Sequence, residues 1–221
     1  MDQTWIAFGD IHNNTSQLAK IPGLRQAAGI LISGDLTNCG GQNESQKILD
    51  QIRWYNPNVL AQIGNMDTQA VENYLETQGI NVHARLTALS PHVALVGLGC
   101  STPTPFCTPS EVSEEQLASW LLATEEKIQD FEHVILMSHT PPFGTATDRL
   151  SSGTSVGSHA VRQWIEKIQP AVCITGHIHE SAATDTIGKT LVLNPGDFAS
   201  GGFIRIFISS QGVTARLETT R

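Results

Sequence analysis

The stretch WIAFGDIH (residues 5–12) decides the fold, because it joins a strand pattern directly to two polar side chains. Residues 5–8 are a short apolar run typical of a buried β-strand, and Asp10 and His12 follow at once. Other apolar runs end in the same way: GDLTN (34–38), GNMD (64–67), MSHT (137–140) and GHIH (176–179). Because the carboxyl ends of strands in an α/β sheet form one ligand-binding edge, we expect these polar residues to converge.

The alternation of strand and helix patterns predicts an α/β fold. Runs rich in Ile, Val and Leu predict strands at residues 5–8, 30–33, 59–63, 93–98, 134–137, 172–175, 191–193 and 203–208. Helical spacing predicts amphipathic helices over residues 18–24, 48–55, 71–75, 117–128 and 161–168. Ser113 predicts a helix start and Gly79 a helix end. The closely spaced last strands favour antiparallel additions or a second sheet. We expect residues 1–221 to form one domain.

Composition narrows the class of protein. Apolar residues make up 40% of the chain and charged residues 15%, which predicts a sizeable buried core. The formal net charge of −8 repels a nucleic-acid polymer, so such a partner is not expected. A small anionic substrate is compatible with this charge if metal ions reverse its sign locally.

The remaining composition signals favour a cytoplasmic protein. The four cysteines form no CxxC pair and no short-range framework, which favours reduced thiols. The beginning of the chain, MDQTWIAFGD, lacks the basic segment and the long apolar run of a signal peptide. No apolar stretch is long enough to predict a membrane span.

The polar residues at the strand ends have the chemistry of a metal site. They are Asp10, His12, Asp35, Asn65, His139, His177 and His179, and no cysteine belongs to the set. Carboxylate, imidazole and amide ligands together suit borderline divalent metals. One Gly-Asp pair is usually only a turn, and one His-x-His can be two histidines on a strand face, but the whole ordered set makes coincidence improbable. Two metals ~3.5–4 Å apart could share a carboxylate, and Asp35 is the best bridge candidate.

The order Asp-x-His, Gly-Asp, Gly-Asn, His and Gly-His-x-His resembles the calcineurin-like metallophosphoesterase superfamily. The resemblance runs from Asp10 to His179 and so covers most of the chain. It implies a four-layer α/β/β/α sandwich of two mixed sheets flanked by helices. It also implies that Asp10, His12 and His179 hold one metal, that Asn65, His139 and His177 hold a second, and that Asp35 bridges them. A hydroxide bound to both metals would then attack phosphorus.

One position departs from the family pattern. The motif Gly-Asn-His commonly supplies a histidine that helps to protonate the leaving oxygen, and here Met66 stands in its place. A thioether cannot donate a proton, and general acid catalysis is typically worth roughly 10²- to 10⁴-fold. We therefore expect a preference for phosphodiesters or activated aryl esters over alkyl monoesters. His159, at the end of the loop over residues 140–158, is the candidate replacement proton donor, although a histidine that starts a helix is more often solvated.

Other functions stay open from the sequence. A metal-binding scaffold for protein interaction is one alternative, and a monoesterase or a nuclease of the same superfamily is another. The ligand types favour manganese or iron, with zinc, nickel or magnesium also possible.

Several residues near these motifs have a structural interpretation. Asp67 could orient a metal ligand or cap the helix that follows it. His83, His92 and His133 match no ligand spacing and are expected at the surface. The proline-rich loop over residues 101–113 and the loop over residues 140–158 are long enough to form a functional rim.

Overall fold

The computed structural model describes residues 2–221 and arranges their strands in two mixed sheets. The first sheet has five strands in the order β11-β10-β1-β2-β3. Its parallel centre is β1 (Gln3–Phe8), β2 (Gly29–Ile32) and β3 (Val59–Ala61). The hairpin of β10 (Gly202–Ser209) and β11 (Gly212–Thr219) adds to it in antiparallel fashion.

The second sheet has six strands in the order β4-β5-β6-β7-β9-β8. Four of them are parallel: β5 (Val93–Leu98), β6 (His133–Ser138), β7 (Val172–Ile174) and β9 (Thr190–Asn194). The edge strands β4 (Arg85–Ser90) and β8 (Ala183–Ile187) pair in antiparallel fashion with β5 and β9.

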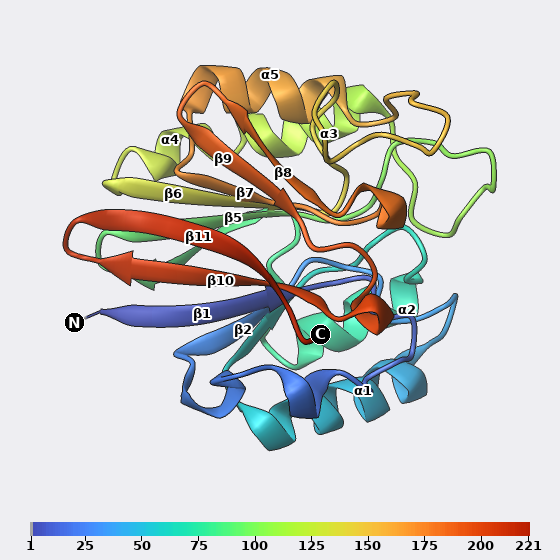
Figure 1. The fold of residues 1–221 in the computed structure, drawn as a ribbon. Helices are drawn as coiled ribbons and strands as arrows, with labels where there is room; N and C mark the ends of the chain where they lie inside the picture. The colour runs from blue at the N-terminus through green and yellow to red at the C-terminus, as the bar shows by residue number, and fades with distance from the viewer. Residues whose placement is uncertain (1) are drawn as a thin grey trace.

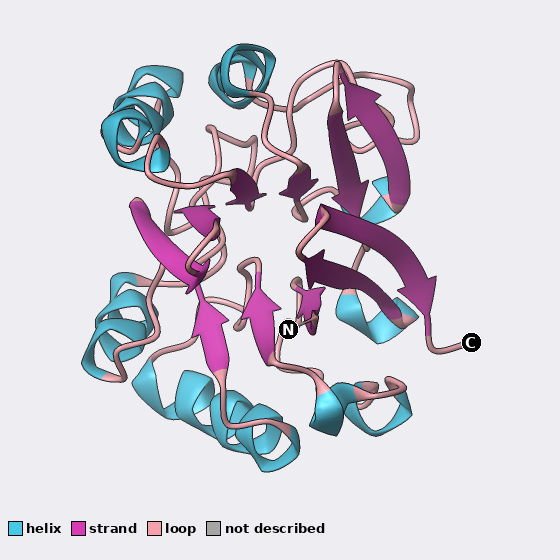
Figure 2. Ribbon diagram, turned by 90° about the vertical axis from the view of Figure 1, so that its left-hand side faces the viewer, coloured by secondary structure: helices cyan, strands magenta, loops and turns pink. Residues whose placement is uncertain are grey.

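Helices cover the outer face of each sheet, so the molecule has four layers (Figure 1). The first sheet is covered by α1 (Gln42–Tyr55) and α2 (Gln69–Thr77). The second sheet is covered by α3 (Glu114–Leu122), α4 (Glu125–Ile128) and α5 (His159–Ile168). Figure 2 shows the two sheets lying between these helices.

The side chains of β1 explain why its sheet is buried on both faces. Ile6 and Phe8 pack in the core under α1 and α2, whereas Trp5 and Ala7 pack in the core between the two sheets. This follows from the period of two along a strand, which directs successive side chains to opposite faces. A third core lies between the second sheet and α3 and α5, and includes Leu98. Three cores between four layers confirm the predicted α/β/β/α sandwich.

The eight predicted strands are present, but three strands were not predicted. These are β4, β8 and β11, each a sheet edge with exposed residues along its length. The predicted helix over residues 18–24 is wrong. Two short 3-10 helices, η1 (Leu18–Lys20) and η2 (Leu24–Gln26), lie there instead. Pro22 interrupts the helix, and so does Gly23, whose φ is +75°.

The predicted helix over residues 117–128 is divided into α3 and α4. It breaks at Ala123 and Thr124, where the buried Thr124 hydroxyl donates to the Leu121 carbonyl. The predicted signals at its start and at the end of α2 are confirmed. The Ser113 hydroxyl accepts from the Gln116 N–H, and Gly79 follows α2 at φ +67°.

Within residues 2–221, no helix is both long and apolar enough to cross a membrane.

Candidate metal centre

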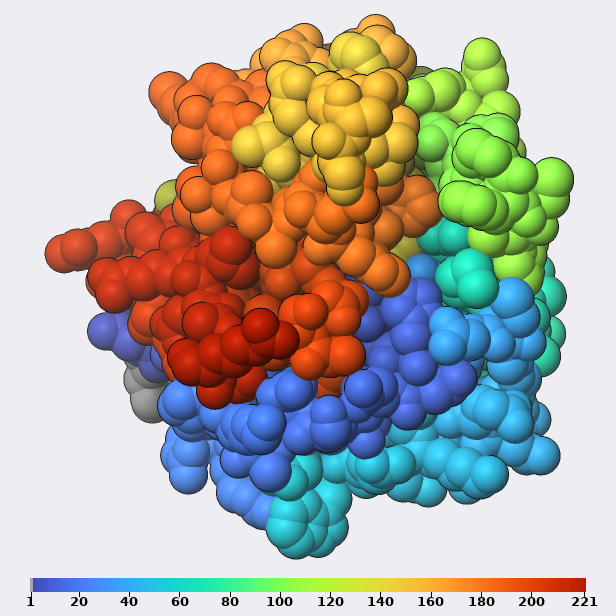
Figure 3. All heavy atoms as spheres, turned by 45° about the vertical axis from the view of Figure 1, so that its right-hand side comes forward, coloured from blue at the N-terminus to red at the C-terminus, as the bar shows by residue number. Residues whose placement is uncertain are grey.

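Loops at the carboxyl ends of five strands bring the seven polar residues to one end of the molecule. The loop after β1 holds Asp10 and His12; those after β2 and β3 hold Asp35 and Asn65, and those after β6 and β7 hold His139, His177 and His179. Both sheets therefore contribute. Figure 3 shows this side of the molecule, with blue segments from the beginning of the chain beside orange segments from near its end.

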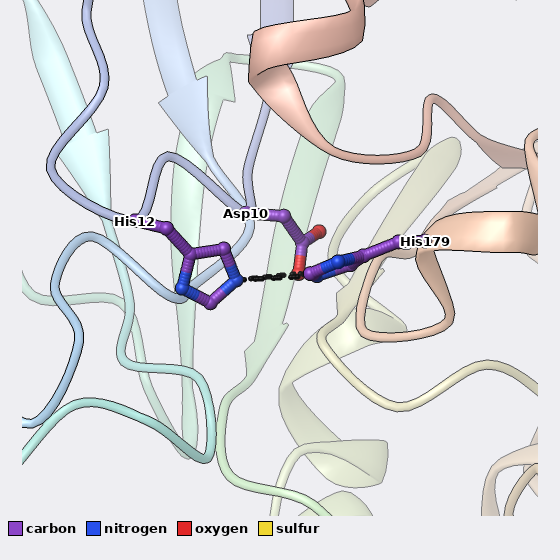
Figure 4. A group of neighbouring side chains, drawn as sticks. All are labelled: Asp10, His12 and His179. Atoms are coloured by element: carbon purple, nitrogen blue, oxygen red, sulfur yellow. Dashed lines mark hydrogen bonds and ion pairs between the residues drawn. The ribbon is translucent and has the colours of Figure 1, made fainter.

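Asp10, His12 and His179 form a first group of converging ligand atoms (Figure 4). The Nε2 atoms of His12 and His179 lie 3.1 Å apart, and His179 Nε2 lies 3.1 Å from Asp10 Oδ1. His12 Nε2 is 4.0 Å from the same carboxylate oxygen. Asp10 is buried, whereas His179 is partly open to solvent. The group thus faces outward from a buried carboxylate.

Asp10, Asp35 and His139 form a second group, which shares Asp10 with the first. The Asp35 carboxylate also reaches the first group, because its Oδ2 lies 3.5 Å from His139 Nε2 and 3.6 Å from His12 Nε2. Asn65 joins this side of the cluster through Oδ1, which is 3.1 Å from His139 Nε2. Asp35 therefore occupies the central place that a bridging ligand needs.

His177 lies beside the second group. Its ring centroid is 5.2 Å from that of His139, and its backbone N–H lies 3.2 Å from both oxygens of Asp10. His177 thus holds the Asp10 carboxylate through its main chain as well as presenting an imidazole nearby.

The backbone that presents these side chains is strained. Asp10, His12, Asp35 and His177 all have positive φ, between +45° and +66°. Such conformations cost about 1–3 kcal/mol each in residues other than glycine and cluster at functional sites. A glycine is needed beside Asp35, because a Cβ on Gly64 would lie 2.1 Å from Asp35 Oδ1.

Hydrogen bonds to the Nδ1 atoms orient two of the imidazoles. His12 Nδ1 lies 2.6 Å from Asn38 Oδ1, and His139 Nδ1 lies 3.1 Å from the Ser33 carbonyl. Both partners are acceptors, so each ring carries a proton on Nδ1 and turns Nε2 toward the cluster. A metal ligand needs this orientation, with Nε2 losing its proton when metal binds.

Gln62 links the carboxyl ends of strands from both sheets. Its buried amide nitrogen donates to the carbonyls of Ser33, Leu98 and Met137, at the ends of β2, β5 and β6. The backbone N–H of His139 donates to one of them, that of Leu98. Gln62 was not singled out from the sequence, because only the tertiary structure brings these carbonyls together.

Asp67 holds the loop that carries Asp35. Its buried carboxylate accepts from the N–H groups of Leu36, Thr37 and Gly64, so it orients this loop. Thr68, not Asp67, is the N-cap of α2. Burial, and next the charge of Asp35, raise the pKa of Asp67 to about 7.

Mutual electrostatics shift the pKa values of the cluster. Burial alone would raise the pKa of Asp35, but the charge and hydrogen bond of His139 lower it. Burial likewise opposes protonation of His139, but Asp35 raises the pKa of this imidazole to about 9. Burial and the nearby His139 lower the pKa of His177 to about 4, and the hydrogen bond to Asp10 raises that of His179. In the absence of metal, protons therefore stand in for cations between the carboxylates.

The donor set fits divalent metal ions. Carboxylate oxygens, imidazole nitrogens and one amide oxygen converge. The Nε2 atoms of His12 and His179 face each other, and in a hydrogen bond between them only one can donate. A cation between such atoms would replace this unfavourable contact by coordination.

Two further histidines, His159 and His83, lie outside the set of seven candidate ligands. His159 is exposed at the start of α5, where its ring stacks on Phe143 with centroids 4.0 Å apart. The expectation that His83 lies at the surface is wrong. His83 is buried, accepts from the Gly99 N–H at Nδ1 and packs edge-on against Trp120.

Comparison with known proteins identifies the family. Residues 115–216 match the family model described as metallophosphoesterase, calcineurin superfamily. The chain is 34% identical over 170 residues to an uncharacterized protein of Methanocaldococcus jannaschii. The aligned segment covers 75% of this chain and 76% of that protein. The chain therefore belongs to the calcineurin superfamily of metallophosphoesterases.

Solved structures share the fold at low sequence identity. The TT1561 protein of Thermus thermophilus is 16% identical, with a TM-score of 0.73 and full coverage of both chains. A dimetal phosphatase from Danio rerio is 12% identical, with a TM-score of 0.64 and 99% coverage of both chains. These likenesses confirm the fold of two mixed sheets flanked by helices.

Proposed function

We propose that this protein is a dinuclear metal-dependent phosphoesterase that hydrolyses a small phosphodiester or an activated phosphomonoester. The observation that carries the proposal is the position of Asp35, which belongs to the second group of ligand atoms and whose Oδ2 also lies 3.6 Å from His12 Nε2 in the first. Asp10, His12 and His179 would hold one metal, Asn65, His139 and His177 the other, and Asp35 would bridge them.

Two divalent ions bound there would activate a water molecule near neutral pH and neutralise charge on the phosphoryl oxygens. The chain's own contribution is to hold the ligands in place. Asn38 and the Ser33 carbonyl orient His12 and His139, and the His177 N–H positions the Asp10 carboxylate. The loops also hold each other, because the Asp10 N–H donates to the Gly34 carbonyl and the His12 N–H donates to the Asp35 carbonyl. These contacts keep Asp10 and His12 at their strained positive φ angles.

The preference for diesters rests on Met66. This residue is half-buried and borders the site, because its backbone N–H donates to Asp35 Oδ1 over 2.8 Å. Its thioether has no proton to give to a leaving oxygen. Leaving groups that depart as stable anions, such as aryl oxides, suffer least from that loss.

His159 is the residue we propose as an alternative proton donor. It follows the loop over residues 140–158, which starts beside His139, and its ring is exposed and stacked on Phe143. If His159 protonates the leaving group, replacing it by alanine lowers monoester turnover more than diester turnover. An equal proportional loss of both turnovers, or no loss of either, would remove this role.

The same reasoning gives the other parts of the proposal. The mixed oxygen and nitrogen ligands favour manganese or iron over zinc, nickel or magnesium. The net charge of −8 favours a small substrate over a nucleic-acid polymer. The four cysteines are free, which supports a cytoplasmic location.

The test compares bis-p-nitrophenyl phosphate with p-nitrophenyl phosphate, using metal-stripped protein resupplied with Mn²⁺. We expect hydrolysis that needs metal, favours the diester and is lost in Asp35→Asn. Faster monoester turnover would overturn the diester preference. Absence of hydrolysis with every divalent metal would instead favour a metal-binding scaffold.

A further inference from the structure

The amide of Asn65 is held by a hydrogen-bond chain that comes from the loop over residues 101–113. Asn65 Nδ2 donates to Thr108 Oγ1 over 2.9 Å, and Thr108 Oγ1 donates to Glu111 Oε1 over 2.5 Å. On its other side, Asn65 presents Oδ1 to His139 Nε2 at 3.1 Å. The chain thus runs from a carboxylate on the loop to a side chain in the cluster.

The direction of these hydrogen bonds determines which way the Asn65 amide faces. A threonine hydroxyl has one proton, and Thr108 gives it to the Glu111 carboxylate, so Thr108 Oγ1 can only accept from Asn65. If the amide turned over, its oxygen would face the oxygen of Thr108 without a proton between them. The amide nitrogen would then point toward His139 and the carboxylates.

Glu111 is well suited to fix the Thr108 hydroxyl. It accepts from the Thr108 N–H at 2.8 Å and from the Thr104 hydroxyl at 2.6 Å. Partial burial raises the pKa of Glu111, but these hydrogen bonds outweigh it and lower the pKa to about 2. Glu111 is therefore ionised in the working range and acts only as an acceptor.

The loop is also fixed to the main chain beside Asn65. The Ser110 N–H donates to the Asn65 carbonyl at 3.0 Å, and the Ser110 hydroxyl donates to the Asp67 carbonyl at 2.6 Å. Both ends of Asn65, side chain and backbone, are thus bonded to the same loop.

We propose that Thr108 and Glu111 are positioning residues for the metal centre, which turn the Asn65 carboxamide so that its oxygen faces the second metal. This inference rests on the proposed function of Asn65 as a ligand. Such outer partners of ligands typically account for roughly 10- to 100-fold in metal affinity.

The test measures Mn²⁺ binding to the metal-stripped full chain by titration calorimetry. We expect Thr108→Val, which keeps the side-chain shape but loses the hydroxyl, to weaken the second Mn²⁺ about tenfold. Thr108→Ser should restore the affinity, because it restores the hydroxyl. Thr102→Val is the control: it removes a hydroxyl on the same loop that bonds neither Asn65 nor Glu111, and should leave Mn²⁺ binding unchanged.

Further variants separate the possible failures. Glu111→Met keeps the length of the side chain but has no oxygen to accept from Thr108, so it should weaken the second Mn²⁺, which covers the case that Thr108→Val fails to fold. If Asn65→Ala loses the second Mn²⁺ while Thr108→Val binds it like the wild type, the positioning role is wrong. If Asn65→Ala itself binds like the wild type, the proposed ligand role of Asn65 fails.

Discussion

The Nε2 atoms of His12 and His179 face each other 3.1 Å apart, although 167 positions separate the two residues along the chain. His12 uses Nδ1 toward Asn38, and His179 Nε2 lies equally close to Asp10. Two imidazole nitrogens and a buried carboxylate therefore meet at one point, where a cation satisfies all three.

Removing His179 should cost one metal ion. We expect His179→Ala to lower the metal content from about two to about one per chain, because the second group keeps its own ligands. Elemental analysis after dialysis against Mn²⁺ measures this. His92→Ala is the control, since His92 is exposed and pairs with Glu132. Unchanged metal content in His179→Ala would contradict its assignment as a ligand.

Placing a histidine at position 66 should add general acid catalysis. We expect Met66→His to raise monoester turnover by up to ~10²-fold, the lower end of what a positioned acid supplies, and diester turnover less. The measurement is kcat/KM for both nitrophenyl esters across pH, where the gained activity should follow an imidazole titration. The same gain with Met66→Gln, which cannot titrate, would mean that proton donation is not the cause.

The glycine beside Asp35 should not tolerate a methyl group. A Cβ at Gly64 would lie 2.1 Å from Asp35 Oδ1 and 2.5 Å from the Asp35 backbone nitrogen. We expect Gly64→Ala to lower the free energy of unfolding by about 1–3 kcal/mol and to weaken metal binding. In Gly41→Ala the nearest atom is 3.8 Å away, so its cost should stay near 1 kcal/mol, with metal binding retained. Chemical denaturation and Mn²⁺ titration of both variants check this; normal metal binding by Gly64→Ala would refute it.

The metal-free protein should lose stability as pH rises above neutrality. The pKa of His139 is about 9 in the folded chain against an ordinary 6.5, so between these values the folded state keeps a proton that the unfolded chain has released. Its stabilising contribution is complete below pH 6.5 and is lost as pH rises toward 9, by up to about 1.4 kcal/mol per pH unit. His179, whose pKa is also raised, adds in the same direction.

Denaturant unfolding of metal-stripped protein at a series of pH values measures this slope. We expect it to flatten in His139→Asn, which lacks the titrating ring. The slope below pH 7 has another source, because Asp67, whose pKa rises from 3.8 to about 7, acts there. An unchanged slope above pH 7 in His139→Asn would rule out His139 as its origin.

The sequence predicted the parts of the fold whose signal is local. Strands such as β1 and β5 are apolar on both faces and stand out, and Asp10 marks the carboxyl end of β1. The edge strands β4, β8 and β11 were missed, because exposed residues interrupt each strand and leave no continuous apolar run. The helix period over residues 18–24 misled, because Pro22 and Gly23 override it.

In the site, too, the features with a local sequence signal could be predicted and those that depend on tertiary contacts could not. The convergence of Asp10, Asp35 and His139 could be predicted, since strand topology alone brings strand ends together. The residues that orient them could not, because the contacts of Asn38 with His12 and of Thr108 with Asn65 depend on how loops fold. Burial of His83 under Trp120 was hidden for the same reason.

The most direct test of the two-metal account is the rate of diester hydrolysis as Mn²⁺ is added stepwise to metal-stripped protein. If both groups of ligands must be filled, the rate stays low through the first equivalent of metal and rises through the second, and Asp35→Asn stays inactive throughout. A rate that saturates at one equivalent, or that persists in protein stripped of metal, would contradict the account.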